Sequence, residues 1–129
     1  MLRIKRVYDK PAKEDGGRVL VDRLWPRGMK KEAAKINLWM KEVAPSDALR
    51  KAFCHDVEKW PEFQKKYRAE LKDKKELLAE LKKIEKERGT LTLLFGAKDE
   101  EHNQAVVLAE VLKEKKEYFR APIGEFREN

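Results

Sequence analysis

The sequence predicts one small α/β domain over residues 1–129, with a mostly parallel or mixed sheet of about four strands flanked by helices. Short apolar runs alternate along the chain with longer segments in which apolar residues recur three or four positions apart, the patterns of strands and helices respectively. The last short run, residues 90–97, is almost wholly apolar, which is typical of a strand buried on both faces of a parallel sheet.

Three earlier segments are also predicted to be extended. Residues 2–8 alternate between apolar and basic side chains. In residues 18–25 the apolar run Val19–Val21 continues into the charged and aromatic residues 22–25 and stops at Pro26, which has no backbone N–H to donate. Residues 36–43 form the third predicted extended segment. The loop at residues 9–17 is too short for a helical crossover, so the first two strands either pair antiparallel or are joined by a tight irregular link.

Helices are predicted between these strands and after the last one. Ser46 is a good N-cap for a helix that reaches about Cys54. The final helix is expected to begin at Glu100, because acidic residues favour the helix dipole there, and to reach about Tyr118. The other expected helices are a short one at residues 29–35, one at 60–71, and one that runs from a capping residue, Asp73, to the terminator Gly89.

Positive charge is concentrated near the N-terminus. Residues 1–35 contain eleven Lys and Arg against five Asp and Glu, in a chain of net charge +7. This distribution favours an acidic partner such as a phosphate ester, a nucleotide or a nucleic-acid backbone, although a solvated basic surface would have the same composition. The sequence does not indicate an oligomeric state.

The single cysteine, Cys54, rules out an internal disulfide framework and fits a reducing compartment. Its neighbour Phe53 suggests that it packs in the core rather than acting as a nucleophile. No apolar run is long enough to cross a membrane, and the N-terminus has no secretory leader, so we expect a cytoplasmic protein without membrane contact.

Unusual polar and aromatic residues cluster just after the predicted strands. If the strands run in the same direction, these segments line one crevice beyond the carboxyl ends of the sheet, where α/β proteins bind ligands. Arg23 and Arg27 would clamp an anion, Trp25 or Trp39 would stack on a ring, and His102 or Asp99 would move a proton. The candidate binding residues are Arg23, Trp25, Arg27, Trp39, Ser46, Lys98 and Asn103, and the candidate catalytic residues are His102 and Asp99.

Other chemistries are less favoured. Neither His55 with Asp56 nor Asp99 with His102 has the spacing of a known metal motif, so no metal site or cofactor is predicted, and Asp56 is expected to cap a turn. No phosphate-cradling glycine motif is present. Ser46 is explained by its capping role, whereas His102 at a helix start would be a neutral base.

Three functions remain open. The leading one is an anion-binding crevice formed by Arg23, Arg27 and Lys98, in a protein that acts on a phosphorylated small molecule or nucleotide. The second is noncatalytic nucleic-acid binding, and the third is a protein interaction module that uses the charged helices. In the second, the phosphate contacts would come from Arg3, Lys5, Arg6, Lys10, Lys13, Arg18, Lys30, Lys31 and Lys35.

Several segments resemble one known family. They are RVLVDRLWPRG at residues 18–28, APS at 44–46, FCHD at 53–56 with a tryptophan shortly after, and LTLLFGAKDEEHNQA at 91–105. Together they resemble the YeaO-like branch of the family called domain of unknown function 488, over nearly the whole chain. The resemblance implies a small bacterial or archaeal α/β protein and names no reaction. Longer relatives carry a segment with cysteine and histidine after the final strand, whereas residues 96–103 here contain no cysteine.

Overall fold

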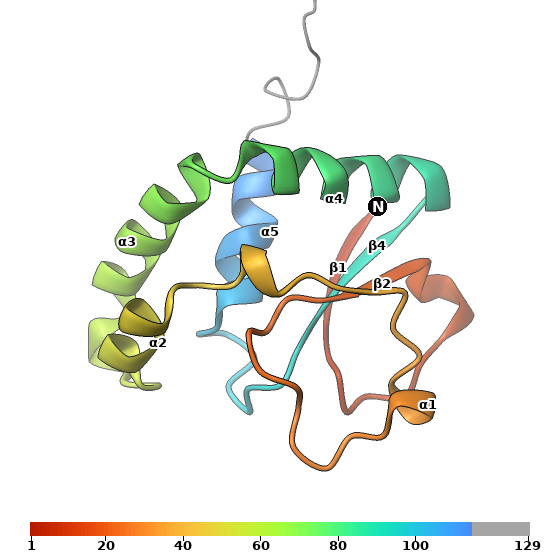
Figure 1. Cartoon of the computed structure of the whole chain (residues 1–129), viewed down its shortest axis with the longest axis horizontal. Helices are drawn as coiled ribbons and strands as arrows, with labels where there is room; N and C mark the ends of the chain where they lie inside the picture. Colours follow the sequence, from red (N-terminus) through yellow and green to blue (C-terminus); the bar gives the residue numbers. More distant parts are fainter. Residues whose placement is uncertain (115–129) are drawn as a thin grey trace, which may run out of the picture.

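Four parallel strands form one sheet in the computed structural model, which describes residues 1–114 (Figure 1). Their order across the sheet is β1-β4-β2-β3. The predicted α/β class with a parallel sheet is therefore confirmed. The strands are β1 (Leu2–Arg6), β2 (Gly17–Leu20), β3 (Leu38–Trp39) and β4 (Leu91–Phe95).

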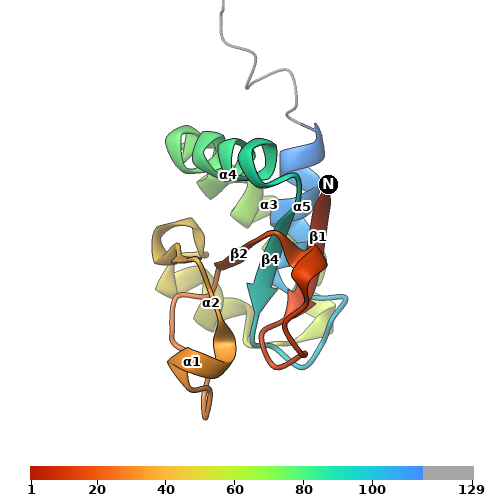
Figure 2. The same ribbon diagram turned by 90° about the vertical axis from the view of Figure 1, so that its right-hand side faces the viewer.

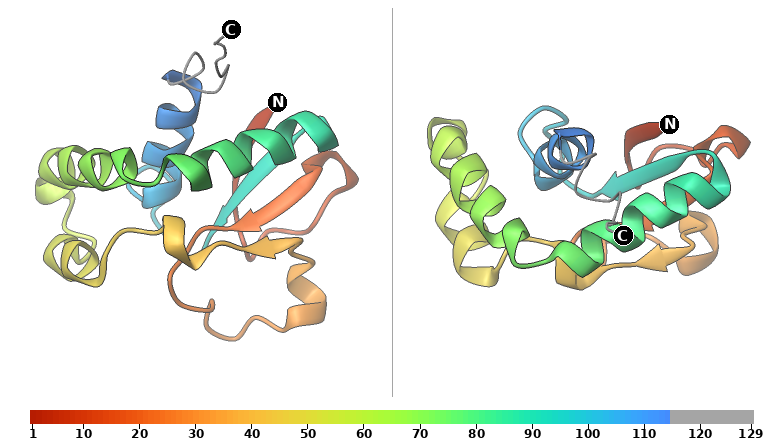
Figure 3. Two further views of the ribbon diagram at one scale, coloured as in Figure 1. Left: turned by 45° about the horizontal axis from the view of Figure 1, so that its top comes forward. Right: turned by 90° about the horizontal axis from the view of Figure 1, so that it is seen from above.

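An α-helix follows each strand of the sheet except β1, which is followed by a 3-10 helix. Figures 1 and 2 show α4 above the strands and α1 at the opposite, lower end. Figure 3 shows that α3 and α4 meet at an angle, so that they bend around the core. The α-helices are α1 (Lys31–Ala34), α2 (Asp47–Phe53), α3 (Trp60–Lys72), α4 (Lys75–Arg88) and α5 (Gln104–Glu114), and three short 3-10 helices are η1 (Lys13–Asp15), η2 (Lys41–Val43) and η3 (Val57–Lys59).

β1 and β2 do not pair with each other, because β4 lies between them and pairs with both in parallel. Of the two links considered from the sequence, the irregular one forms, and it contains η1. β4 is the most apolar strand and all five of its residues are buried, so a central position removes the most apolar surface from water. The antiparallel alternative is therefore wrong.

β3 is shorter than predicted. Only Leu38 and Trp39 pair with β2, and the chain turns immediately afterwards, where the Val43 N–H donates to the Met40 carbonyl at 3.3 Å. Residues 41–43 form η2 instead of continuing the strand. Of the predicted extended segment at residues 36–43, only residues 38–39 therefore form a strand.

α5 begins later than predicted. Asn103 is its capping residue, since its Oδ1 accepts hydrogen bonds from the Ala105 N–H at 2.9 Å and the Val106 N–H at 3.2 Å. The prediction of a start at Glu100 with acidic residues in the first turn is wrong, because Asp99 holds the preceding residues in a separate turn. The predicted extension to Tyr118 and the tail after it lie outside the described residues.

The remaining helix signals are mostly confirmed. The Ser46 hydroxyl accepts a hydrogen bond from the Leu49 N–H and caps α2, and Pro61 lies in the first turn of α3. Gly89 ends α4 with a φ of 80°, a left-handed conformation that glycine adopts without strain. Asp73 ends α3 instead of capping α4, so that part of the prediction is wrong.

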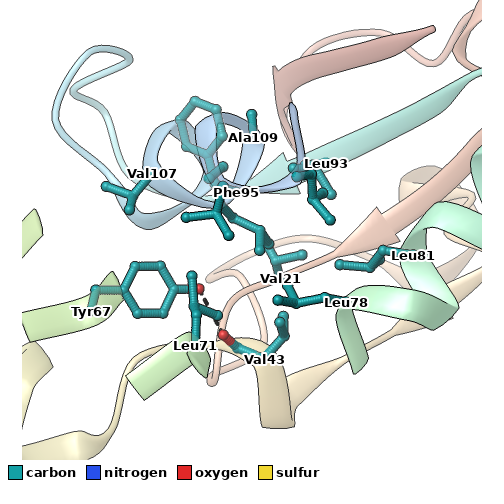
Figure 4. Packing of buried hydrophobic residues seen from close by; sticks show 14 of the residues in the cluster. Val21, Val43, Tyr67, Leu71, Leu78, Leu81, Leu93, Phe95, Val107 and Ala109 are labelled. Carbon is teal, nitrogen blue, oxygen red and sulfur yellow. Dashed lines mark hydrogen bonds between the residues drawn. The ribbon is translucent and has the colours of Figure 1, made fainter. Parts of the chain in front are cut away.

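The two faces of the sheet are covered by different segments. Leu91, Leu93 and Phe95 of β4 join residues of α3, α4 and α5 in the larger apolar cluster (Figure 4). The alternate residue Leu94 points to the other face, where it packs in a smaller cluster that includes Ala34 of α1. Within residues 1–114, no helix combines the length and the apolar character that a membrane span requires.

Tyr67 fixes α3 against the segment after β3. Its ring is fully buried and its hydroxyl donates a 2.7 Å hydrogen bond to the Val43 carbonyl (Figure 4). Burial raises the pKa of this hydroxyl well above its ordinary value. The bond holds the residues that follow β3 in place beside the carboxyl edge of the sheet.

Candidate functional site

A cleft of about 820 Å³ lies at the carboxyl edge of the sheet. Its walls include residues that follow all four strands, namely Tyr8, residues 22–27, residues 44–45, residues 96–99 and residues 102–104. The second half of α2 and the turn after it, residues 50–51 and 53–55, contribute the remaining wall together with Phe63 of α3. The volume lies within the range of small-molecule sites, and the position is the one at which open parallel sheets bind ligands.

Two arginines of the cleft wall are held by other protein groups. Arg23 donates from Nε to the Pro45 carbonyl at 3.1 Å and from Nη2 to the Ala44 carbonyl at 3.3 Å, which ties the loop after β2 to the loop after η2. Arg50 forms a hydrogen-bonded ion pair with Asp47 at 3.3 Å on the protein surface. Both guanidinium groups therefore contribute positive charge from fixed positions.

Three further cations line the cleft without a protein partner. Within residues 1–114, no hydrogen bond or ion pair holds the side chain of Arg27, Lys51 or Lys98. The backbone of Arg27 is nevertheless fixed, because its carbonyl accepts a 2.7 Å hydrogen bond from the Tyr8 hydroxyl. The cleft thus has charged groups that an anion could bind without breaking an existing contact.

The two tryptophans predicted to stack on a ligand have different positions. Trp25 lines the cleft and donates from Nε1 to the Met29 carbonyl at 2.7 Å. Trp39 lies behind it, with the ring centroids 5.3 Å apart, and is not among the lining residues. Its own Nε1 donates to the Asp22 carbonyl at 2.7 Å. Trp39 therefore supports Trp25 and the loop after β2 from the far side.

Asp99 and His102 form a pair on the cleft wall, with His102 Nδ1 and Asp99 Oδ2 2.8 Å apart. The backbone N–H of Glu101 lowers the pKa of Asp99, and the His102 side chain lowers it further. Since Nδ1 faces Asp99, Nε2 is the ring nitrogen left for a ligand. His102 lies two residues before α5, outside the first helical turn in which it was expected to lie.

Ser46 and Asn103 are fully engaged in maintaining the fold. Besides capping α2, the Ser46 hydroxyl donates to Glu70 Oε2 at 2.6 Å, and Ser46 does not line the cleft. Asn103 does line it but is only 2% exposed, and its Nδ2 donates to the Asp99 carbonyl at 2.9 Å while its Oδ1 caps α5. These bonds account for both residues without a ligand.

Asp22, which was not a candidate from the sequence, lies in the cleft wall just after β2. Its Oδ2 accepts a 2.8 Å hydrogen bond from the Gly96 N–H, and its Oδ1 accepts one from Gln104 Nε2. Burial raises the pKa of Asp22 to about 6, although these two hydrogen bonds oppose the rise. Its place at the end of an apolar strand was the signal in the sequence that could have identified it.

Cys54 and His55 also line the cleft, and both have left-handed backbone conformations, with φ values of 44° and 58°. Cys54 is exposed, so the expectation that it packs in the core is wrong. Asp56 caps the following turn as predicted, since its Oδ1 accepts a 3.0 Å hydrogen bond from the Glu58 N–H. Within residues 1–114, no three His, Cys, Asp or Glu side chains are grouped to hold a metal ion.

Much of the basic N-terminal region is engaged inside the protein. Asp15 is completely buried, and Arg3, Lys5 and Arg18 approach its carboxylate at 3.6, 3.0 and 2.5 Å. Arg18 is itself only 5% exposed. Arg6 donates to two backbone carbonyls in the loop after β4. These four cations stabilise the fold and are held by protein groups.

Comparisons with known proteins agree with the resemblance drawn from the sequence. A family model described as the inactive DUF488-N3 subclade matches residues 1–122. The uncharacterized protein YeaO of Escherichia coli strain K12 is 45% identical over 112 residues, which cover 87% of this chain and 96% of YeaO. The uncharacterized protein Rv3073c of Mycobacterium tuberculosis strain H37Rv is 40% identical over 111 residues, 86% of this chain and 92% of that protein.

No solved structure matches this chain. The family match covers most of the sequence, including all four strands and all five α-helices. The chain therefore belongs to the DUF488 family, in the branch that contains YeaO.

Proposed function

We propose that this protein binds a phosphorylated small molecule or nucleotide in the cleft at the carboxyl edge of the sheet. The observation that carries the proposal is the group of three cations, Arg27, Lys51 and Lys98, which line the cleft and have no partner within residues 1–114. A phosphate group would bind them without displacing a protein contact, and a guanidinium can hold two phosphate oxygens at once.

The balance of charge in the cleft supports an anionic ligand. Five Lys and Arg side chains line it, against the two carboxylates of Asp22 and Asp99. Asp99 is already paired with His102, so it opposes an anion less than a bare carboxylate would. Tyr8, Trp25 and Phe53 add aromatic surface, which suits a ligand that has a ring as well as a phosphate.

Binding without turnover is the form of this function that we favour, because the matching family is described as an inactive subclade. The Asp99–His102 pair is the observation that favours an enzyme instead, since a carboxylate that orients an imidazole is a common acid–base arrangement. His102→Ala separates the two. A binding protein shows no turnover either as wild type or as the variant, whereas an enzyme turns over its substrate as wild type and loses turnover in the variant.

Nucleic-acid binding by the N-terminal face is less favoured. Arg3, Lys5, Arg6 and Arg18 contact protein groups, so five of the nine cations proposed for phosphate contacts remain exposed on that face: Lys10, Lys13, Lys30, Lys31 and Lys35. A protein that binds through many phosphate contacts loses affinity steeply as salt rises. Measurements at two salt concentrations would reveal such binding.

The test is a thermal-shift screen of wild type, Arg27→Ala and Arg88→Ala against phosphorylated metabolites, nucleotides and short single-stranded RNA and DNA. Arg88 is a matched control, because it is exposed at the end of α4 and does not line the cleft. A ligand that binds the folded state raises Tm by mass action. We expect a small phosphate ester to raise Tm of wild type and Arg88→Ala but not of Arg27→Ala. A shift with nucleic acid alone, or an equal shift in all three proteins, would contradict the proposal.

A further inference from the structure

The position of Asp22 narrows the class of ligand that the cleft can take. We propose that Asp22 is a recognition residue that accepts a hydrogen bond from a hydroxyl or N–H group of the ligand. The molecule bound would then be a phosphate ester that carries donors, such as a sugar phosphate or a nucleotide, rather than a simple anion. This inference rests on the proposed function of the cleft.

Asp22 is held in one orientation. The Gly96 N–H and Gln104 Nε2 each donate to a different oxygen of its carboxylate. Gly96 lets the carboxylate approach closely, because a Cβ at that position would lie only 3.0 Å from Asp22 Oδ2. An ionised carboxylate can accept roughly four hydrogen bonds, so about two remain for a group in the cleft.

No cation neutralises this carboxylate. Within residues 1–114, Asp22 forms no ion pair, although five Lys and Arg side chains line the same cleft. Arg23, the adjacent residue, directs its guanidinium to two backbone carbonyls instead. The charge of Asp22 is therefore available to a ligand that donates a hydrogen bond, and it repels a ligand that presents only oxygen acceptors.

The fold itself gains little from this charge. An asparagine at this position could accept from the Gly96 N–H with its one carbonyl oxygen and donate from its NH2 group to the side-chain oxygen of Gln104, so these contacts do not require a charge, and burial disfavours the ionised group. A carboxylate that is costly to the fold and faces a ligand-sized cleft is more typical of a binding residue than of a structural one. The cations would hold the phosphate, and Asp22 would select the part of the ligand next to it.

The test compares the affinity of two kinds of ligand by isothermal titration calorimetry at neutral pH. Ribose 5-phosphate and adenosine monophosphate carry donors beside the phosphate, and inorganic phosphate is the simple anion. The proteins are wild type, Asp22→Asn and Asp73→Asn. Asp73 is a matched control, because it is exposed at the junction of α3 and α4 and does not line the cleft.

We expect wild type to bind at least one ester more tightly than inorganic phosphate, and Asp22→Asn to lose roughly tenfold or more of that affinity. Inorganic phosphate should bind Asp22→Asn as well as wild type or better, because a repelling charge is gone. Asp73→Asn should behave as wild type.

Three outcomes would overturn the inference. If Asp22→Asn binds the esters and inorganic phosphate equally well or better than wild type, Asp22 only repels anions, and the proposed function of the cleft still stands. If wild type binds neither ester more tightly than inorganic phosphate, the inference about Asp22 is wrong, and the proposed function of the cleft still stands. If wild type binds none of the three ligands, the proposed function fails together with it.

Discussion

Two aspartates at opposite ends of β2 have contrasting surroundings. Asp15 lies just before the strand, is completely buried and is approached by Arg3, Lys5 and Arg18. Asp22 lies just after the strand and is bound by a backbone N–H and an amide side chain, without an ion pair in the described part of the chain. The fold pairs the first carboxylate with cations, whereas hydrogen bonds and the nearby His55 offset the cost of burying the second only in part.

The pKa values of the two carboxyl groups move in opposite directions as a result. Burial alone would raise the pKa of Asp15, but hydrogen bonds from the Ala12 N–H, Lys5 and Arg18 outweigh it and lower that pKa. Burial raises the pKa of Asp22 to about 6, because its hydrogen bonds do not compensate fully. The comparison indicates that Asp15 stabilises the fold, whereas the surroundings of Asp22 are those expected of the proposed recognition residue.

The largest expected effect is that of Asp15→Ala. The substitution leaves Arg18 buried without its partner, and removing one partner of a buried ion pair costs about 3–5 kcal/mol. Urea unfolding at neutral pH measures the loss. Because the pKa of Asp15 is lowered, its contribution is present above the ordinary carboxyl pKa and is lost as pH falls. The deficit should therefore shrink in acid. A loss similar to that of Asp9→Asn, an exposed control, would contradict this role.

The next effect has the opposite sign. Asp22→Asn should increase the free energy of unfolding at pH 8 by about 1–2 kcal/mol, because the folded state no longer holds a desolvated charge. A raised folded-state pKa means that the contribution of Asp22 is present below about pH 4 and is lost as pH rises to about 6. The gain of the variant should therefore disappear near pH 4. A variant less stable than wild type at pH 8 would show that Asp22 is a structural residue.

A smaller effect is expected for Gln104→Ala, which removes one of the two donors to Asp22. An unsatisfied, partly buried carboxylate oxygen should lower the free energy of unfolding by about 1 kcal/mol at pH 8. In the double variant with Asp22→Asn, the two effects should not add, because the groups are in direct contact. Additive effects in urea unfolding would indicate that the two side chains do not interact.

The smallest effect on stability is expected for Arg27→Ala. The Arg27 side chain is exposed and forms no hydrogen bond or ion pair with the described residues, so the free energy of unfolding should change by less than about 0.5 kcal/mol. Urea unfolding of wild type and variant without ligand measures this. A loss above about 1 kcal/mol would mean that Arg27 supports the fold, and its ligand-binding effect would then need separate proof.

Local patterns of residues were sufficient to predict most of the fold. The stripe of Phe63, Tyr67 and Leu71 predicted α3, and all three are buried, because helical spacing alone places them on one face. β3 was predicted too long, since an apolar run does not show how many of its residues find a partner. Its length depends on β2, with which only Leu38 and Trp39 pair.

The candidate site was predicted less well, for a physical reason. Arg27 and Lys98 could be placed near one another, because both follow parallel strands. The environment of Asp22 depends on Gly96 and Gln104, which are 74 and 82 positions away in sequence. A single sequence shows no pairing over such distances, so the position of Asp22 after a strand could be read from the sequence, whereas its hydrogen-bond partners and its burial could be found only in the folded structure.

The most direct test of the central claim is a titration of the isotope-labelled protein with adenosine monophosphate, followed by nitrogen–proton correlation NMR spectra. Anion binding in the cleft predicts saturable changes at the backbone amides of residues 22–25, 27–28 and 96–104, with little change in η1 or α1. Saturable changes confined to the exposed lysines of η1 and α1, or a spectrum that does not respond at all, would contradict the claim that this cleft is the binding site.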